Sequence, residues 1–309
     1  MNYIDFHCDT ASRLFYKDKE LFRNDFSVDI GKMIKGKCLA QFFAMFINNK
    51  DLESPFMIAS DMIDNFHKEL TKNKDYIELA LDYKTLIENK GSNKMSAFLT
   101  IEEGEALEGN IDNLKFFYDK GIRLITLTWN YENSIGYPHI MKEKACFGLK
   151  NFGKELVQAM NHYKMLIDVS HLNDSGFNDV LNLSKYPVLA SHSNSRAVKG
   201  HSRNLGDDMI RKLAGSGGVM GLNFCSGFMG ENEVTKIEDM KKHINHIKNV
   251  GGIDVLALGS DFDGISNQVE IKNASEMDKL HSALKGELSE DDIEKIYYKN
   301  ALRVIKDVL

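Results

Sequence analysis

The sequence predicts an α/β protein with the fold of a closed (β/α)8 barrel, the TIM barrel. Eight short apolar runs, rich in β-branched and aromatic residues, alternate with longer amphipathic stretches, which is the pattern of parallel strands joined by helices. The length of 309 residues suits eight such units in one barrel. No Gly-X-Gly-X-X-Gly motif follows any of the runs, so an open nucleotide-binding sheet fits less well.

The predicted strands form one uninterrupted series, at residues 3–8, 37–47, 95–102, 122–129, 165–171, 187–192, 218–224 and 255–264. Helix-like segments lie between them, among others at 111–121, 152–163, 207–217 and 237–252, and several end in glycine as helix C-caps do. Residues 50–90 make an unusually long crossover, which we expect to decorate the barrel with two or more helices. No low-complexity tract or linker is visible, so residues 1–309 are expected to form a single domain.

The composition indicates which kinds of molecule the protein can bind. With 45 acidic and 39 basic residues the net charge is −6, and no cluster of Lys or Arg offers a face for phosphates, so we expect no nucleic-acid partner. The four cysteines include no Cys-X-X-Cys pair, which predicts reduced, mostly buried thiols and argues against a zinc ribbon. No apolar run approaches the length of a membrane span, and no leader pattern is visible. We therefore expect a cytoplasmic protein that acts on a small molecule, with no membrane partner.

Polar residues gather where the predicted strands end, which in a TIM barrel is where an active site is built. The chain opens MNYIDFHCDT, so Asp5, His7 and Asp9 already interrupt an apolar first strand. Strand ends carry His7 and Asp9, Glu102, Trp129 and Asn130, His171, His192, Asn223, and Asp261 and Asp263, in chain order. A single strand-end histidine is more often a hydrogen-bonded structural residue than a ligand. Several histidines and carboxylates together would be costly to bury without a divalent cation.

The number of these groups is consistent with two metal ions. His7, Asp9, His171 and His192 give four ligands, and Glu102 between them could bridge two ions that each keep an open position for water or substrate. A set of histidines and carboxylates without cysteine suits zinc, with Mn, Co or Fe as possible substitutes. Two metals sharing a carboxylate would lower the pKa of a bridging water, which is the chemistry of hydrolysis.

The motifs as an ordered set resemble those of the membrane (renal) dipeptidase family, zinc peptidases whose TIM barrel is of the metal-dependent hydrolase type found in the amidohydrolase superfamily. The matching stretches are DFHCD, LTIEEG, TLTWN, GLKNFGKELV, LIDVSH, ASHSNSRAV, SRNLGDD, GSDFDG and NALRVI, which run nearly from end to end. A short piece such as HCD or SHS alone would mean little, whereas the complete series is highly specific.

The resemblance implies a role for each matched residue. It implies that one ion is bound by His7 and Asp9, the other by His171 and His192, with Glu102 as the bridge. It also implies that Asp261 transfers the proton and that Arg203 holds the free carboxylate of the substrate. An Arg fork suits a carboxylate. The implied substrates are dipeptides, sometimes with a D-residue at the C-terminal position, and the resemblance suggests a homodimer.

Two residues depart from the pattern of that family. Glu103 follows Glu102 where the family usually has glycine, and strand alternation can turn only one of the two acids inward, so both stay candidates for the bridge. Trp129 stands where many members have histidine. An indole has one donor and no charge, so it is expected to stabilise an oxyanion less than imidazole and to narrow the mouth against bulky N-terminal side chains.

Two further interpretations of the chain stay open. The first is another amidohydrolase of the same barrel, acting on N-acyl amino acids or cyclic amides, and the second, more remote, is a non-catalytic metal- or peptide-binding barrel. The remaining histidines and one acid are expected to be structural: His243 and His246 beside a buried helix stripe, His67, His162 and His281 on other helices, and Asp263 as a loop cap.

Overall fold

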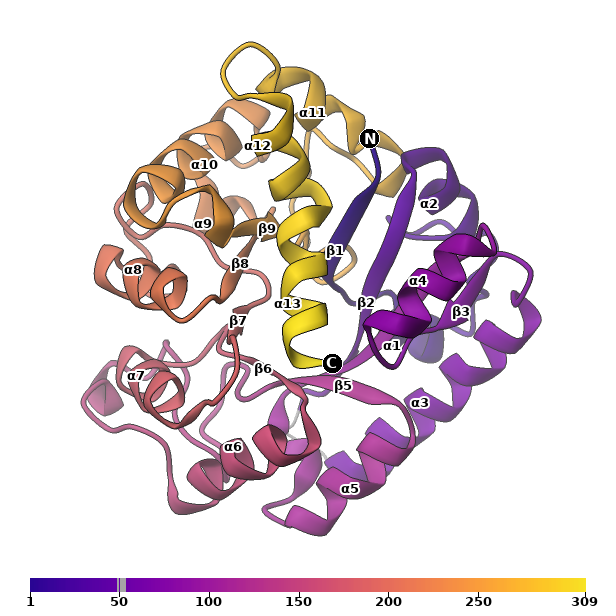
Figure 1. Ribbon diagram of the computed structural model, residues 1–309. Coiled ribbons are helices and arrows are strands. Elements are labelled where there is room, and N and C mark those ends of the chain that lie inside the picture. Colours follow the sequence, from indigo (N-terminus) through magenta and orange to yellow (C-terminus); the bar gives the residue numbers. More distant parts are fainter. Residues whose placement is uncertain (49, 51–53) are drawn as a thin grey trace.

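The structure, a computed structural model, describes residues 1–48, 50 and 54–309. Parallel strands close into a barrel in the order β2 (Cys38–Phe46), β1 (Tyr3–Cys8), β9 (Leu256–Leu258), β8 (Val219–Leu222), β7 (Leu189–Ala190), β6 (Leu166–Asp168), β5 (Ile122–Thr126) and β4 (Met95–Glu102). Pairing of β2 with β4 closes the ring. Figure 1 shows the helices arranged around these strands. The predicted (β/α)8 barrel is thus confirmed.

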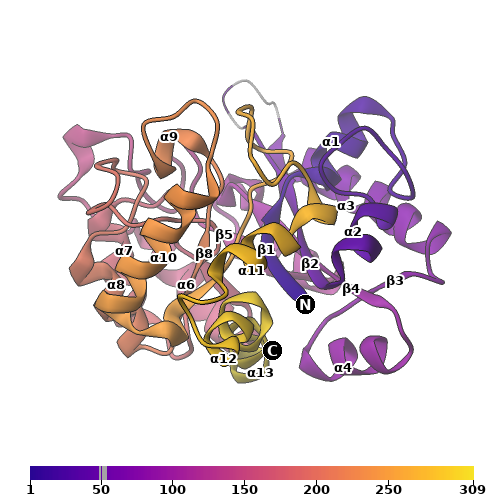
Figure 2. The same cartoon turned by 90° about the horizontal axis from the view of Figure 1, so that it is seen from above.

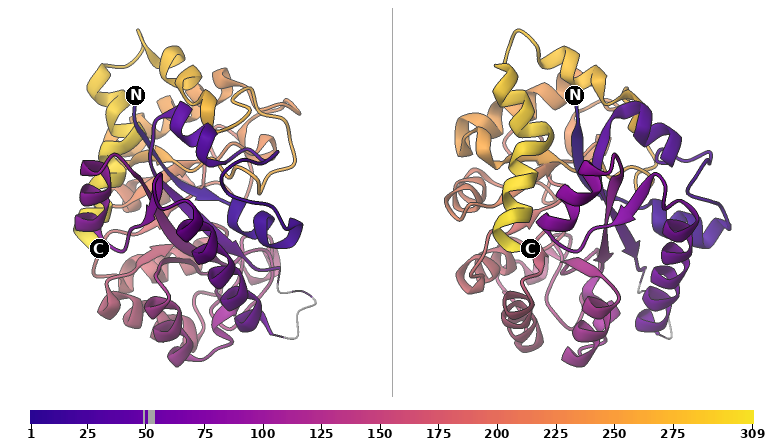
Figure 3. Two further views of the ribbon diagram at one scale, coloured as in Figure 1. Left: turned by 90° about the vertical axis from the view of Figure 1, so that its right-hand side faces the viewer. Right: turned by 45° about the vertical axis from the view of Figure 1, so that its right-hand side comes forward.

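The long crossover contains a short strand that the sequence did not reveal. Helix α3 (Pro55–Lys72) and helix α4 (Tyr83–Gly91) are the expected decoration, and β3 (Ile77–Leu79) lies between them. β3 pairs with the first residues of β4, below the stretch of β4 that pairs with β5. It therefore lies outside the closed ring, and α3 packs along the outside of the strands (Figure 3). Residues 49 and 51–53 of this crossover lie outside the described residues.

The other helices follow the strands in the expected alternation. They are α1 (Thr10–Lys17), α2 (Ile30–Gly36), α5 (Ile111–Asp119), α6 (Asn151–Tyr163), α7 (Asp174–Leu183), α8 (Asp207–Gly215), α9 (Ser226–Met229), α10 (Ile237–Gly251), α11 (Asp278–Leu284), α12 (Glu290–Glu294) and α13 (Asn300–Val308). Side-chain caps set where several begin: Asp29 accepts the N–H of Lys32 in α2, and Asp82 that of Thr85 in α4. The four helices predicted between residues 111 and 252 are confirmed as α5, α6, α8 and α10.

Several strands are shorter than predicted, so some of the polar residues expected at strand ends lie in the following loops. β5 ends at Thr126, β6 at Asp168 and β9 at Leu258, so the residues expected at these strand ends lie in the loops that follow. The backbone leaves strand geometry there, with φ of 67° at His171 and 61° at Asp261. These left-handed residues turn the chain, so the polar side chains are placed by loops as well as by strands.

One end of the barrel is closed by apolar packing. Inside the barrel the rings of Phe42 and Phe98 stack with centroids 4.6 Å apart, and Phe6 packs against Phe42 in a tilted contact at 4.8 Å. Val304 and Ile305 of α13 belong to the same buried cluster. Figure 2 shows α13 at one end of the barrel and α1 and α9 at the other. This apolar packing lies opposite the end where the strands terminate and the ligand residues gather (Figure 2).

The described residues contain no helix that is both long and apolar enough to cross a membrane. All four cysteines are unbonded, as expected of reduced thiols. Cys8 and Cys38 are buried and Cys225 is partly buried, whereas Cys146 is exposed, so the expectation of burial is met only in part.

Two glycines allow β7, β8 and β9 to approach each other at the mouth. A Cβ on Gly259 would lie 1.8 Å from the carbonyl oxygen of Ser191 and 3.2 Å from Cα of Gly221. We expect Gly259→Ala to destabilise the fold by about 1 to 3 kcal/mol or more, because backbone atoms must move apart to admit the methyl group. Urea unfolding measures this loss. Gly215→Ala is the matched control, because its Cβ meets nothing within 4 Å; an equal loss in the control would contradict the explanation.

Candidate active site

The carboxylate of Glu102 lies at the centre of the mouth and faces two groups of ligands. Its Oε2 is 3.3 Å from Nε2 of His7, which is 3.3 Å from Oδ2 of Asp9. Its Oε1 is 3.2 Å from Nε2 of His171 and 3.5 Å from Nε2 of His192. All five side chains are buried. The structure therefore brings together the five residues expected to bind metal, with one oxygen of Glu102 toward each pair.

The electrostatics of this cluster favour a cation. Burial and the neighbouring Glu102 charge raise the pKa of Asp9 to about 6. Burial would lower the pKa of His7, but Glu102 and Asp9 hold it well above its usual value, so positive charge is stabilised at this point. Burial and the positive charge of Arg203 lower the pKa of His171 to about 4, which keeps its imidazole neutral, the form that binds metals.

The donor set fits divalent ions. Nε2 of His171 and Nε2 of His192 are 3.1 Å apart and point to the same carboxylate oxygen, an arrangement in which two lone pairs converge. Oδ1 of Asp9 is buried without a hydrogen-bond partner in the described residues. Nitrogen and oxygen atoms that converge in this way, with no sulfur among them, suit zinc and the neighbouring transition metals.

Hydrogen bonds behind the histidines hold their rings in place. Ser191 Oγ donates to Asp168 at 2.5 Å, so its oxygen accepts from Nδ1 of His192 at 2.7 Å. Nδ1 of His171 donates to Oδ1 of Asn130 at 3.2 Å. With the proton on Nδ1, each ring presents the lone pair of Nε2 to the centre of the cluster.

Asp5 has a structural role, although it lies in the same polar stretch of the first strand as His7 and Asp9. Its carboxylate accepts the N–H and the hydroxyl of Ser260, at 2.8 and 2.6 Å, and it tightens the contact between β1 and the loop after β9.

The neighbouring acids Asp261 and Asp263 have different surroundings. Oδ1 of Asp261 lies 3.9 Å from Nε2 of His7, and its Oδ2 accepts from the amide of Asn223 at 3.0 Å. Burial and then the charges of Asp9 and Glu102, partly offset by His7, raise the pKa of Asp261 to about 8. Asp261 thus stands beside the ligand cluster as a group able to carry a proton.

Asp263 is turned to the loops around it. Its carboxylate accepts from the hydroxyl of Thr10 at 2.6 Å and from the N–H of Ser27 at 2.7 Å. These bonds fasten the loop after β9 to α1 and to the segment before α2, which matches the structural role expected for this residue.

Glu103 is also turned away from the ligand cluster. It accepts the N–H of Trp129 at 3.0 Å, the amide of Asn133 at 2.5 Å and the N–H of Glu105 at 2.9 Å. Its φ of 87° is one that glycine adopts readily and other residues rarely do. Of the two adjacent acids, only Glu102 faces the mouth.

Arg203 is buried in the loop after β7 with part of its fork unpaired. Nη1 donates to the hydroxyl of Ser193 at 2.7 Å, and the guanidinium lies 5.8 Å from the ring centroid of Phe228. Nε and Nη2 are buried without a partner in the described residues. Leaving a buried cation in this state is costly, and a carboxylate that docks on these two donors would remove the cost.

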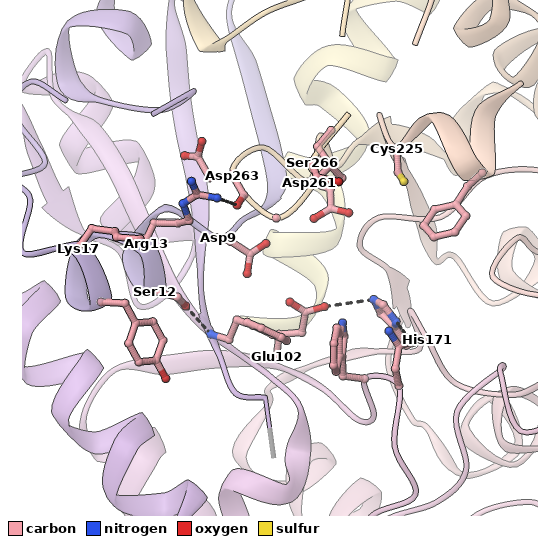
Figure 4. Close-up of a pocket in the computed structure, with 17 residues that line it drawn as sticks. Asp9, Ser12, Arg13, Lys17, Glu102, His171, Cys225, Asp261, Asp263 and Ser266 are labelled. Atoms are coloured by element: carbon pink, nitrogen blue, oxygen red, sulfur yellow. Dashed lines mark hydrogen bonds and ion pairs between the residues drawn. The ribbon is translucent and has the colours of Figure 1, made fainter. Parts of the chain in front are cut away.

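A cavity of about 630 Å³ opens above the cluster (Figure 4). It is lined by Asp9, Ser12, Arg13, Tyr16, Lys17, Phe46, Glu102, Trp129, Asn130, His171, Cys225, Phe228, Asp261, Asp263, Gly264, Ile265 and Ser266. Trp129 forms one wall, with its ring 4.8 Å from Phe46 in an edge-to-face contact. The indole therefore occupies space on the side of β2 and β5, while the cavity continues along α1.

The strand-end pattern did not reveal several residues at the mouth. His139 lies in the long loop before α6; its N–H donates to the carbonyl of His171 at 2.7 Å, and its Nδ1 is 2.8 Å from the hydroxyl of Ser202. Burial and the charge of Arg203 lower its pKa to about 2. Arg13 and Lys17 enter the cavity from α1, one and two turns beyond Asp9, and helical spacing from a strand-end ligand could have indicated them.

The histidines expected to be structural lie away from the cavity lining. His243 is buried, accepts the N–H of Ser195 at 3.1 Å and donates to the carbonyl of Met229 at 2.8 Å. His246 pairs with Asp207 at 2.8 Å. His67, His162 and His281 lie on α3, α6 and α11.

Comparison with known proteins identifies the family. The family model described as membrane dipeptidase (peptidase family M19) matches residues 1–309. The chain belongs to this family. An uncharacterized dipeptidase of Schizosaccharomyces pombe is 33% identical over 255 residues, which are 77% of this chain but only 61% of that relative. Dipeptidase tcpJ of Claviceps purpurea is 26% identical over 99% of this chain and 73% of its own length.

Solved structures share the fold at low sequence identity. A metallo peptidase from Rhodobacter sphaeroides, bound to a phosphinate mimic of the dipeptide L-Ala-D-Ala, has a TM-score of 0.92 at 23% identity and covers 100% of this chain and 99% of its own. An amidohydrolase from Pseudomonas aeruginosa has a TM-score of 0.85 at 22% identity and covers 99% of this chain and 96% of its own. The barrel of this M19 chain is thus shared with these proteins along its whole length.

The different surroundings of the two adjacent acids give a test of the bridge. We expect Glu102→Gln to lower the content of bound divalent metal sharply, because an amide carries no charge and offers one oxygen in place of two. Glu103→Gln is the matched control and should keep its metal. Elemental analysis after reconstitution with zinc and removal of the excess measures both. Equal metal content in the two variants would show that Glu102 is not the bridging ligand.

Proposed function

We propose that this protein is a dinuclear, zinc-dependent dipeptidase that hydrolyses the peptide bond of dipeptides with a free C-terminal carboxylate. The observation that carries the proposal is the buried Glu102 carboxylate, whose two oxygens face His7 with Asp9 on one side and His171 with His192 on the other. Mn, Co or Fe could replace zinc with this set of ligands. The proposed homodimer and cytoplasmic location stay predictions.

The residues around the cluster have separate tasks in this proposal. When bound, two ions would supply a bridging hydroxide near neutral pH and polarise the scissile carbonyl. Arg203 holds the C-terminal carboxylate of the dipeptide on its unpaired Nε and Nη2. Asp261 takes the proton of the attacking water and gives it to the leaving amine, while Asn223 holds its other oxygen.

Asp261 gives the first test of this mechanism. We expect Asp261→Asn to keep its metal and to lose about 10²- to 10⁴-fold in kcat, because the amide preserves the shape but cannot carry a proton. Steady-state kinetics together with elemental analysis measure the two effects. Near-normal kcat in a metal-replete variant would assign the proton transfer to another group.

Arg203 gives the test that separates a dipeptidase from an enzyme with a wider range. We expect Arg203→Met to reduce kcat/KM for free dipeptides by an amount equivalent to roughly 1.5 to 3 kcal/mol, and to leave any weak turnover of C-terminally amidated dipeptides little changed. Arg211→Met, on the exposed face of α8, is the control.

The wild-type panel for this test includes free dipeptides, amidated dipeptides, N-acyl amino acids and cyclic amides. Turnover of N-acyl amino acids or cyclic amides in preference to dipeptides would replace the proposal with the wider amidohydrolase function. Absence of turnover on every substrate by the zinc-loaded protein would favour a non-catalytic metal- or peptide-binding barrel.

A further inference from the structure

The cavity continues along α1, which follows β1, on one side of the mouth. Arg203, in the loop after β7, lies next to the cavity lining, with its guanidinium 5.8 Å from the ring centroid of Phe228, which lines the cavity. In the closed ring of eight strands, β7 lies opposite β2. Arg203, which follows β7, therefore lies across the mouth from β1 and β2. Figure 4 shows Arg13 and Lys17 on one side of Glu102, and His171 and Cys225 on the other.

If the protein is the dipeptidase proposed above, this geometry sets the direction in which the dipeptide lies across the mouth. With the C-terminal carboxylate on Arg203 and the scissile carbonyl above Glu102, the N-terminal residue must extend toward α1. The cavity has room on that side, because its lining continues over Arg13, Tyr16 and Lys17. These residues are spaced by three and four positions, so they share one face of the helix.

The α1 wall, defined here as Arg13, Tyr16 and Lys17, carries two positive charges. In the part of the chain that the structure describes, neither Arg13 nor Lys17 lies within ion-pair distance of a carboxylate. The guanidinium of Arg13 is held in place, since Nη1 donates to the carbonyl of Asp263 at 3.0 Å and the group lies 5.1 Å from the ring centroid of Phe26. Its other N–H groups stay free for a ligand.

The described acids nearest to this wall make no ion pair with it. The carboxylate of Asp263 is already occupied by Thr10 and Ser27. Asp9 and Glu102 point to the histidines of the cluster. Arg13, Tyr16 and Lys17 are exposed to solvent at the cavity, so their side chains can meet an anion that enters it.

We propose that the α1 wall is a subsite for an anionic side chain on the N-terminal residue, so that the preferred substrates are dipeptides that begin with Asp or Glu. Arg13 provides a fixed fork for the side-chain carboxylate, Lys17 adds a mobile charge, and the hydroxyl of Tyr16 adds a donor. This inference rests on the proposed dipeptidase function and names its substrate class.

The experiment compares dipeptides that differ only in charge at the first residue. Glu-, Gln-, Lys- and Ala-dipeptides with one common C-terminal residue are assayed with the zinc-loaded enzyme. We expect kcat/KM for the Glu substrate to exceed that for the Gln substrate roughly 10-fold or more at low salt, and the Lys substrate to be the poorest. Because the wall is open to solvent, the Glu preference should shrink at about 0.5 M NaCl.

Variants of the wall test its residues. Arg13→Met and Lys17→Met should each lower the ratio of kcat/KM for Glu over Gln, and the double variant should bring it close to one. Arg13→Lys should keep part of the preference. Arg211→Met is the control for removal of an exposed arginine and should leave the ratio as in the wild type. If Arg13→Met does not fold, Lys17→Met and the salt dependence decide, because Lys17 makes no ion pair with a described residue.

The outcomes separate this inference from the proposed function. If the wild type hydrolyses no dipeptide, the proposed function fails. If it hydrolyses Gln- and Ala-dipeptides with no preference for Glu, only the subsite is overturned. Equal losses on Glu and Gln substrates in Arg13→Met would show that the arginine acts only by holding the loop of Asp263, and would also overturn the subsite.

Discussion

Burial of charge at the mouth of the barrel is the constraint on which the rest of this structure depends. Glu102 is 3% exposed and is surrounded by three imidazoles and a second carboxylate. A carboxylate in such a place is stable only if positive charge and hydrogen bonds meet both of its oxygens. The site can therefore be understood as an arrangement of groups that favours a bound cation.

This constraint explains the buried network around the ligands. Asp168 accepts from Thr126 and Ser191, and through Ser191 it orients His192. On the other side of the barrel, Asp5 is bound by Ser260. Each of these acids connects two neighbouring strands or their loops. The hydrogen bonds that orient the ligand residues therefore also stabilise the mouth of the barrel. The apolar closure by α13 lies at the end of the barrel opposite to the mouth (Figure 2).

Much of this arrangement could be predicted from the sequence, because periodicity and strand ends are local properties. Alternating apolar runs predicted the barrel, and the convergence of parallel strand ends predicted Glu102 and the four residues around it. The strand β3 was missed because three residues carry too little pattern. His139 was missed because a loop residue reaches the mouth through tertiary packing. The unpaired state of Arg203 is likewise a property of the surrounding fold, which no local spacing records.

The two departures from the family pattern meet at one loop of the mouth. Glu103, which stands where the family usually has glycine, keeps the positive φ of 87° that suits glycine, and its carboxylate accepts the N–H of Trp129. Backbone strain at Glu103 is thus offset by bonds to the loop that carries Trp129 and Asn130, and Asn130 in turn orients His171. The bond comes from the backbone N–H of Trp129, so it anchors this loop whatever side chain stands at position 129 and does not depend on the indole. Its effect is to fix one wall of the cavity, while the wall formed by α1 remains open to the substrate.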